Sequence, residues 1–337
     1  MSEVILPDYI QFLQQKENYP HPVDDVSLIQ THISFVLLAG DSVYKWKKPV
    51  DFGFLNFSTL EKRKYYCEQE LELNRRLCQD LYEEVVTLNV YGDSFCLNGT
   101  GEVVENGIKM SRMPEEKMMG RMMAAGQVTR DHIDAIIEKL VPFYESAAGD
   151  AAITEFGLAK SVAVNVLENF EQTEGFVGQG AIDKQQFDKI ASYSKEFLSH
   201  EDRFQARIDA GKIRDCHGDM HSANICLTDP VSIFDCIEFN ERFRYTDVAA
   251  DVAFLAMDLD FHGETELSDY FIKQFVAKSA DTGLMEMLNF YKCYRTYVRA
   301  KIALFTASDP AVDAATKDAC IAQAKKHFQL AEQYAAA

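Results

Sequence analysis

The chain has 337 residues, of which 47% are hydrophobic and 26% charged, as is typical of a globular protein long enough for two domains and a sizeable core. Its 34 basic and 53 acidic residues give a formal charge of −19, which argues against a nucleic-acid partner; the charge is compatible with a cationic substrate, although a solvated acidic surface explains it more simply. The sequence predicts no membrane span and no signal peptide, and its eight cysteines form no close pair, so we expect a reduced, cytoplasmic protein.

The N-terminal part of the chain predicts an antiparallel sheet with one main helix. Pro7 begins a short helix over residues 6–16, and Gly40-Asp41 is a hairpin signal between two strand-like runs. Ser58 is followed three residues later by Glu61, a capping pair that begins a helix over residues 58–78. Strands are expected at residues 26–30, 32–39, 42–50, 84–89, 94–97 and 107–111.

The sequence becomes helical after a hinge at residues 110–114. Amphipathic patterns with few breakers predict helices at residues 129–145, 153–174, 183–197, 248–260 and 288–306. We therefore expect an α+β protein of two domains. Residues 1–112 would hold the sheet and the helix, and residues 113–337 would be mostly helical, with substrate-binding helices toward the C-terminus.

Three polar residues are embedded in apolar sequence further along the chain. Asp219 and Asn224 belong to a segment over residues 215–227, and Asp235 belongs to a segment over residues 233–239. Two short strands joined by a turn would bring these side chains to one end of a small hairpin. Phosphoryl transfer requires such a set, because one carboxylate orients the attacking hydroxyl while an amide oxygen and a second carboxylate hold a metal ion on the phosphates.

The sequence His-Gly-Asp-Met-His-Ser-Ala-Asn, from His217 to Asn224, resembles the catalytic loop of the aminoglycoside phosphotransferase family. The following Ile-Phe-Asp, which ends at Asp235, resembles the metal-binding aspartate of that family. The resemblance implies a bilobal, protein-kinase-like fold that binds ATP and Mg²⁺. It also implies that Asp219 is the catalytic carboxylate, that His217 shapes the loop, and that Asn224 and Asp235 bind the metal.

The resemblance assigns further residues to the nucleotide. Lys45, between bulky strand-forming residues, matches the lysine that contacts the α- and β-phosphates, and Glu70 matches the glutamate that pairs with it. Glu68 is the alternative partner, and either glutamate could instead be solvated on a charged helix.

For two further groups of residues, the sequence is compatible either with binding of the nucleotide or with a purely structural role. Ser34, with Thr31 and His32, could donate hydrogen bonds to phosphate or could belong to a strand. Met110 and Met113 could form an apolar wall for adenine or fill the core.

Two departures separate this chain from protein kinases. The first strands lack a Gly-x-Gly-x-x-Gly loop, and His-Gly-Asp replaces His-Arg-Asp. Both departures indicate a phosphotransferase that acts on a small-molecule hydroxyl, in what looks like an uncharacterised bacterial branch of the family. The alternatives are a pseudokinase-type regulator that binds nucleotide, a kinase with a protein acceptor, and a metal-dependent hydrolase that would use His217, Asp219 and His221. The sequence does not indicate an oligomeric state.

Four charged residues are predicted to lie in apolar surroundings. Asp247 and Asp251 are one helical turn apart and could bind a metal. The resemblance instead implies that they cap a helix and hydrogen-bond the catalytic loop. Arg295 and Arg299 lie on one largely apolar face of the helix over residues 288–306 and therefore need partners. The simpler interpretation is salt bridges to Glu238, Asp258 or Asp260, and the alternative is a substrate pocket that includes fixed positive charge.

Overall fold

A computed structural model describes residues 6–92 and 94–337. The chain forms two compact units: residues up to Met118 together with Cys226–Asn240, and Met119–Ile225 together with Glu241–Ala337. The first unit contains an antiparallel sheet and the second is mostly helical, so the predicted α+β class is confirmed. The segment Cys226–Asn240, which contains Asp235, belongs to the sheet unit rather than to the helical one.

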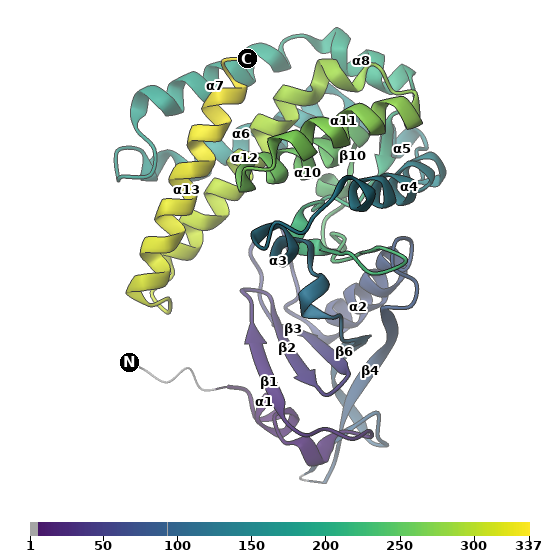
Figure 1. The fold of residues 1–337 in the computed structure, drawn as a ribbon. Coiled ribbons are helices and arrows are strands. Elements are labelled where there is room, and N and C mark those ends of the chain that lie inside the picture. The colour runs from purple at the N-terminus through teal and green to yellow at the C-terminus, as the bar shows by residue number, and fades with distance from the viewer. Residues whose placement is uncertain (1–5, 93) are drawn as a thin grey trace. The chain divides into compact units, whose positions relative to one another are not determined.

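The first unit is built on a six-stranded sheet with the order β1-β2-β3-β6-β4-β5 (Figure 1). All neighbouring strands pair in antiparallel fashion. The predicted hairpin is present, because Ala39 of β2 pairs with Ser42 of β3 across a turn in which Gly40 has φ +60°. The strands are β1 (Val26–Gln30), β2 (Ser34–Ala39), β3 (Ser42–Lys47), β4 (Tyr82–Tyr91), β5 (Ser94–Leu97) and β6 (Glu102–Ser111).

The two faces of β3 have different surroundings because successive side chains of a strand point to opposite sides. Tyr44 and Trp46 are fully buried in an apolar cluster that includes Ile10 and Leu13 of helix α1 (Asp8–Leu13). The opposite face carries Lys45 and faces helix α2 (Leu60–Asn74), whose Cys67 packs with Ile108 and Met110 of β6. Strand β3 therefore presents Lys45 and Lys47 toward Glu70 of α2.

Helix α2 is shorter than the predicted 58–78. Its N-cap is Thr59, whose side chain accepts a hydrogen bond from the backbone nitrogen of Lys62. Ser58 does not cap the helix because its hydroxyl donates to Asn56 Oδ1 at 2.6 Å. The predicted capping residue was thus wrong by one position.

The second unit is helical, with α10 buried along most of its length (Figure 1). Helix α10 packs against α11 and α12, and α13 runs along α12. Among the described residues, no helix is both long and apolar enough to cross a membrane. The helices are α3 (Met119–Ala124), α4 (Arg130–Ser146), α5 (Ala151–Thr154), α6 (Ala159–Thr173), α7 (Lys184–Leu198), α8 (Glu201–Asp209), α9 (Glu241–Arg244), α10 (Val248–His262), α11 (Thr265–Ser279), α12 (Leu284–Ser308) and α13 (Ala314–Tyr334).

The single helix predicted over residues 153–174 is interrupted. Helix α5 ends at Thr154, a 3₁₀ turn follows, and α6 begins at Ala159. Gly157 lies so close to Ile213 that a Cβ atom there would be 2.4 Å from its side chain. This tight packing against a strand, which no helical periodicity reveals, explains the break.

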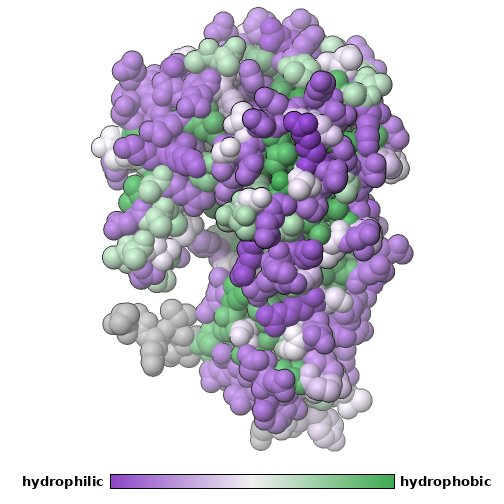
Figure 2. Space-filling model, viewed as in Figure 1, coloured by the Kyte–Doolittle hydropathy of each residue, from purple (hydrophilic) through white to green (hydrophobic). Residues whose placement is uncertain are grey.

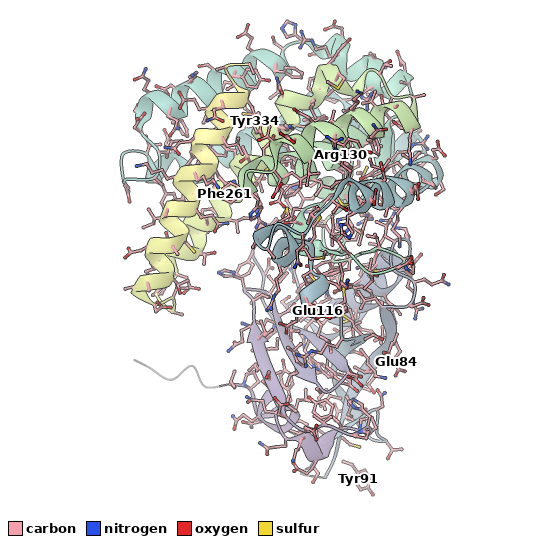
Figure 3. All side chains as sticks on the ribbon, viewed as in Figure 1. Glu84, Tyr91, Glu116, Arg130, Phe261 and Tyr334 are labelled. Atoms are coloured by element: carbon pink, nitrogen blue, oxygen red, sulfur yellow. The ribbon has the colours of Figure 1, made fainter. Side chains whose placement is uncertain are left out.

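Ring contacts and hydrogen bonds connect α13 to the end of α10, where Figure 3 labels Phe261 and Tyr334. Phe261 stacks on His327 with ring centroids 3.8 Å apart, and the Tyr334 hydroxyl donates to Asp260 Oδ2 at 2.6 Å. On the side drawn in Figure 2, most surface residues are hydrophilic and the hydrophobic ones are scattered among them, as in ordinary water-exposed surfaces.

Candidate active site

A cluster of charged side chains lies on the α2 side of the sheet. Lys45 Nζ is 2.8 Å from Glu70 Oε1 and 2.7 Å from Asp235 Oδ1. Lys47 Nζ is 2.6 Å from the other oxygen of Glu70 and also contacts Glu238. Glu70 is fully buried, whereas the Asp235 side chain is 46% exposed. Asp235 is therefore the member of the cluster that a ligand could reach.

The two lysines keep Glu70 ionised in spite of its burial. Burial alone would raise the pKa of Glu70, but Lys45 and Lys47 lower it to about 2. Burial likewise opposes the charge of Lys45, but Asp235 and Glu70 raise its pKa above the usual range. Burial and the nearby Glu70 raise the pKa of Glu238, although Lys47 acts in the opposite direction. One carboxylate thus holds two buried ammonium groups in place.

The cluster settles which glutamate contacts Lys45 and adds a lysine that the sequence analysis did not assign. Glu70 is the partner, while Glu68 is exposed and lies 3.9 Å from Lys64. Lys47 is only 1% exposed and shares Glu70 with Lys45. The alternation of side chains along β3 could have placed Lys47 on the same face as Lys45. Its burial was not predictable, because a lysine with other lysines close by in the sequence is usually exposed.

The segment around Asp235 has a constrained backbone. Asp235 has φ +61°, a left-handed conformation that is costly for a residue with a Cβ atom. The hydroxyl of Tyr82 lies 3.3 Å from its backbone nitrogen, and Asn74 of α2 accepts from the nitrogen of Cys236 at 2.9 Å. Asn74 is one helical turn from Glu70 and donates to the carbonyl of Glu70 at 2.8 Å. The same helix therefore positions both the lysine partner and the Asp235 segment.

The other predicted nucleotide residues are at least partly buried. Ser34 lies opposite Lys47 in the β2–β3 pairing, and its buried hydroxyl makes no hydrogen bond within the described residues. Met110 is 9% exposed in the cluster beneath α2, and Met113 and Phe234 pack against that cluster. Phosphate and adenine contacts for these residues stay predictions.

The predicted catalytic loop, in the second unit, is held by a buried carboxylate. Asp251 of α10 accepts hydrogen bonds from the backbone nitrogens of His217 at 2.7 Å and Gly218 at 3.0 Å, as predicted for this aspartate. Gly218 has φ +86°, which favours glycine at that position. His217 Nδ1 in turn accepts from the backbone nitrogen of Asp219 at 3.2 Å. Asp247, the other predicted support, caps α10 through the nitrogen of Ala249.

Two side chains orient the Asp219 carboxylate. Asn224 Nδ2 donates to the carbonyl of Asp219 at 2.9 Å and to its Oδ2 at 3.0 Å. His221 Nε2 lies 3.3 Å from the same carboxylate oxygen. The Asp219 side chain is 31% exposed. It is thus a fixed carboxylate that a hydroxyl group could approach.

The neighbours of Asp219 keep it ionised. Burial would raise the pKa of this carboxyl group, but the imidazole of His221 and the guanidinium of Arg299 hold it well below its usual range. Arg299 Nη1 is 3.5 Å from His221 Nε2. Arg295 instead lies 3.8 Å from Asp251 and over the ring of Phe254. The predicted ion pairs of these two arginines with Glu238, Asp258 or Asp260 were therefore wrong.

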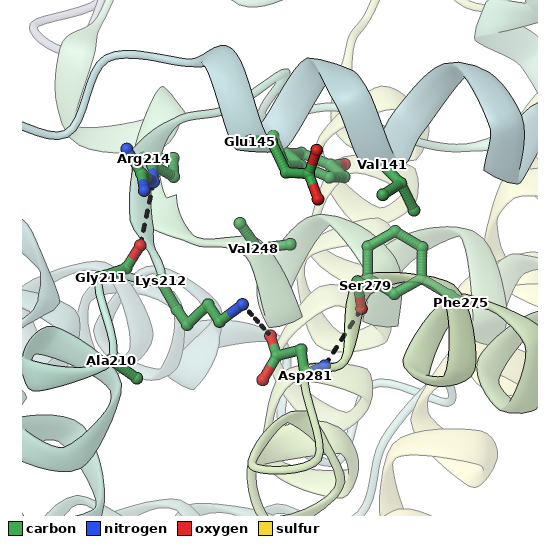
Figure 4. Close-up of a pocket in the computed structure, with 11 residues that line it drawn as sticks. Val141, Glu145, Ala210, Gly211, Lys212, Arg214, Val248, Phe275, Ser279 and Asp281 are labelled. Carbon is green, nitrogen blue, oxygen red and sulfur yellow. Dashed lines mark hydrogen bonds and ion pairs between the residues drawn. The ribbon is translucent and has the colours of Figure 1, made fainter.

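A small cavity of about 110 Å³ lies elsewhere in the helical unit (Figure 4). In its wall, Lys212 Nζ is 3.9 Å from Asp281 Oδ2, and Arg214 donates to the carbonyl of Gly211 at 3.0 Å. The cavity is too small for a nucleotide, since pockets for drug-sized ligands measure about 300–1,000 Å³. None of the predicted site residues is among those that line it.

The hydrolase alternative would need a metal centre at His217, Asp219 and His221. Over the described ranges 6–92 and 94–337, no group of three or more His, Cys, Asp or Glu side chains could hold a metal ion.

Sequence comparison connects the chain to bacterial proteins of unassigned activity. No family model matches the sequence. The chain is 34% identical over 319 residues to uncharacterized proteins of Mycobacterium tuberculosis and Mycobacterium bovis. The alignment covers 93% of this chain but 61% of those proteins, so the chain spans about three fifths of the length of these relatives. These relatives agree with the predicted uncharacterised bacterial branch.

Structural comparison defines the class of fold. The chain superposes on an ethanolamine kinase from Plasmodium vivax with a TM-score of 0.52 and 12% identity, covering 98% of this chain and 91% of the kinase. It superposes on a candidate aminoglycoside phosphotransferase from Ralstonia eutropha with a TM-score of 0.51 and 12% identity, covering 97% and 96%. The chain therefore has the kinase-like fold of these proteins, and the predicted resemblance is confirmed at the level of the fold.

Proposed function

We propose that the protein is an ATP- and Mg²⁺-dependent phosphotransferase that moves the γ-phosphoryl group to a hydroxyl of a small molecule. The observation that carries the proposal is the geometry of Asp219. Its carboxylate is partly exposed and ionised, and the amide of Asn224 and the imidazole of His221 hold it in one orientation. A fixed carboxylate of this kind is what a kinase uses to orient an attacking hydroxyl.

The charged cluster of the first unit suits the nucleotide. Glu70 holds Lys45 with its ammonium group beside the exposed Asp235, so that the lysine can contact phosphate oxygens while the glutamate keeps it in place. Lys45 and Glu70 have the order along the chain, and make the side-chain contact, that the resemblance implies for the phosphate-binding lysine and its glutamate partner. The role of Ser34, Met110 and Met113 near phosphate and adenine is part of the same proposal.

Two hard oxygen donors fit Mg²⁺. Asn224 uses its amide nitrogen for both hydrogen bonds to Asp219 and makes none through Oδ1 within the described residues, so that oxygen can bind a cation. Asp235 offers a carboxylate that is almost half exposed. Carboxylate and amide oxygens suit Mg²⁺, which also keeps water and phosphate ligands. When bound, the metal would neutralise charge on the phosphates.

The lowered pKa of Asp219 determines what this carboxylate does. A weakly basic carboxylate does not remove the proton of an alcohol before the reaction begins. It accepts a hydrogen bond from the hydroxyl, orients the oxygen toward phosphorus, and takes the proton as the bond to phosphorus forms. Asn224 and His221 maintain this orientation, so most of the rate enhancement arises from positioning.

A small acceptor is supported by the two structures with which the chain superposes, one an ethanolamine kinase and the other a candidate aminoglycoside phosphotransferase. A cytoplasmic location is part of the proposal, because all eight cysteines are free thiols.

The test is ATP turnover with Mg²⁺ across amino alcohols, hydroxy acids, sugars, aminoglycosides and protein acceptors. Wild type and Asp219→Asn should bind ATP equally, and only wild type should transfer phosphate. Asp229→Asn is the matched control, because it removes the same charge from an exposed turn. ATP binding without transfer to any acceptor would indicate the pseudokinase-type regulator, and transfer that survives Asp219→Asn would remove Asp219 from its role.

A further inference from the structure

The guanidinium of Arg299 is the unusual charge beside Asp219. Arg299 lies on α12, and its Nη1 and the Asp219 carboxylate both contact the same atom, Nε2 of His221. The two groups are therefore separated by no more than two contact distances. A small molecule could reach both of them at once.

The hydrogen bonds of His221 show that Arg299 has no acceptor there. His221 Nδ1 accepts a hydrogen bond from the backbone nitrogen of Ala223 at 3.3 Å, so this nitrogen carries no proton. The proton of a neutral imidazole then resides on Nε2, which donates it to Asp219. A nitrogen that donates cannot also accept from a guanidinium. The contact between Arg299 and His221 is therefore not a hydrogen bond that satisfies the arginine.

No carboxylate lies within ion-pair distance of Arg299 in the described residues either. Across residues 6–92 and 94–337, the arginine has no ion pair. Other arginines of the helical unit do: Arg242 lies 2.7 Å from Glu168, and Arg244 lies 2.6 Å from Asp215. A guanidinium with five donors, half-buried and without an acidic partner, favours binding of an anion.

The acidic residues near the end of α10 are already occupied. Asp258 accepts from the backbone nitrogen of Ser222 at 2.9 Å, and Asp260 lies 2.8 Å from Lys292 Nζ. Asp219 itself is the carboxylate whose pKa Arg299 lowers, and cations also lie near Arg299. Burial, and then Arg299 and other neighbouring cations, lower the pKa of His327 on α13 to about 3.

We propose that Arg299 binds an anionic group, a carboxylate or a phosphate, of the acceptor whose hydroxyl is presented to Asp219. The inference rests on the proposed phosphotransferase function and specifies its substrate class: a hydroxy acid or a phosphorylated alcohol rather than an amino alcohol. The γ-phosphoryl group of the nucleotide is the other anion that could contact Arg299. If Arg299 binds the acceptor, the KM for the acceptor depends on the arginine. If it binds the γ-phosphoryl group, the KM for ATP depends on it instead.

The experiment compares hydroxy acids with their neutral amides, at saturating ATP and Mg²⁺, in wild type, Arg299→Gln and Arg130→Gln. Arg130 is the matched control, because it is an exposed arginine of α4 that stacks on Tyr270. Wild type and Arg130→Gln should prefer each acid to its amide. Arg299→Gln should raise KM for the acids about 10- to 100-fold, the loss expected for a charged hydrogen bond, with KM for the amides and for ATP unchanged.

A wild-type preference for amides or amino alcohols would overturn the inference, and so would an Arg299→Gln variant that raises KM for ATP and slows all acceptors equally. Both outcomes leave the phosphotransferase activity itself intact, so the two proposals fail separately. Calorimetry with inorganic sulfate provides a measurement that needs no turnover. Wild type and Arg130→Gln should bind sulfate more tightly than Arg299→Gln, and equal binding by all three would contradict an anion site at Arg299.

Discussion

Replacement of Glu70 by glutamine tests the charged cluster of the sheet unit. Glutamine keeps the size of the side chain but removes the charge that faces Lys45 and Lys47, whose Nζ atoms lie 2.8 and 2.6 Å from the carboxylate oxygens. An NH₂ group replaces one carboxylate oxygen, so its N–H donors face an ammonium group that is itself a donor. Removal of one partner from a buried ion pair costs about 3–5 kcal/mol. The depression of the Glu70 pKa to about 2 corresponds to about 3 kcal/mol, in the same range.

The stability of the sheet unit can be followed separately from that of the helical unit. Trp46 is the single tryptophan of the chain and is fully buried in β3, so its fluorescence reports unfolding of the sheet unit. In urea, Glu70→Gln should lower the midpoint by about 1 M or more, given a typical slope of 1–3 kcal/mol per M. Glu68→Gln, on the exposed side of the same helix, should change stability by less than about 0.5 kcal/mol. Equal effects of the two substitutions would refute the role assigned to Glu70.

Three more predictions concern the same structure. Because the pKa of Glu70 is lower in the folded than in the unfolded protein, its contribution to stability is full above about pH 4.3 and is lost as pH falls toward about 2. In urea titrations from pH 7 to pH 3, the difference in free energy of unfolding between wild type and Glu70→Gln should therefore become smaller. A difference that stays constant would contradict the assignment. Gly107→Ala would place a Cβ atom 2.7 Å from the Trp46 ring, so it should destabilise the sheet unit by about 1–3 kcal/mol, whereas Gly120→Ala, with its nearest such contact at 3.8 Å, should not destabilise the protein. Asp251→Asn should lower kcat with little change in KM for ATP, because Asp251 holds the loop and not the nucleotide; an unchanged kcat would show that the loop needs no such support.

The sequence predicted the parts of the structure that depend on local order. The hairpin at Gly40-Asp41 and the helix that contains Glu70 follow from turn residues and a capping signal, and the structure contains both. The pairing of Lys45 with Glu70 and the support of the loop by Asp251 were predicted from the family resemblance, and the structure contains both contacts.

Contacts between distant segments were not predictable. Lys47 meets Glu238 across 191 positions of the chain, and neither residue type indicates burial by itself. Arg295 meets Asp251 rather than any acidic residue expected for it, because the rotation of α10 against α12 determines the partner. The surroundings of Arg299 were not predictable for the same reason. Whether it forms an ion pair depends on the partners that the nearby carboxylates already have in the folded chain.

The most direct test of the central claim is calorimetric titration of the protein with ATP, with and without Mg²⁺, in wild type, Lys45→Met and Asp235→Asn. The account predicts one ATP per chain, binding that Mg²⁺ strengthens in wild type, weaker binding in Lys45→Met, and loss of the Mg²⁺ effect in Asp235→Asn. Absence of ATP binding by the wild type, or binding that is the same in all three proteins with and without Mg²⁺, would contradict it.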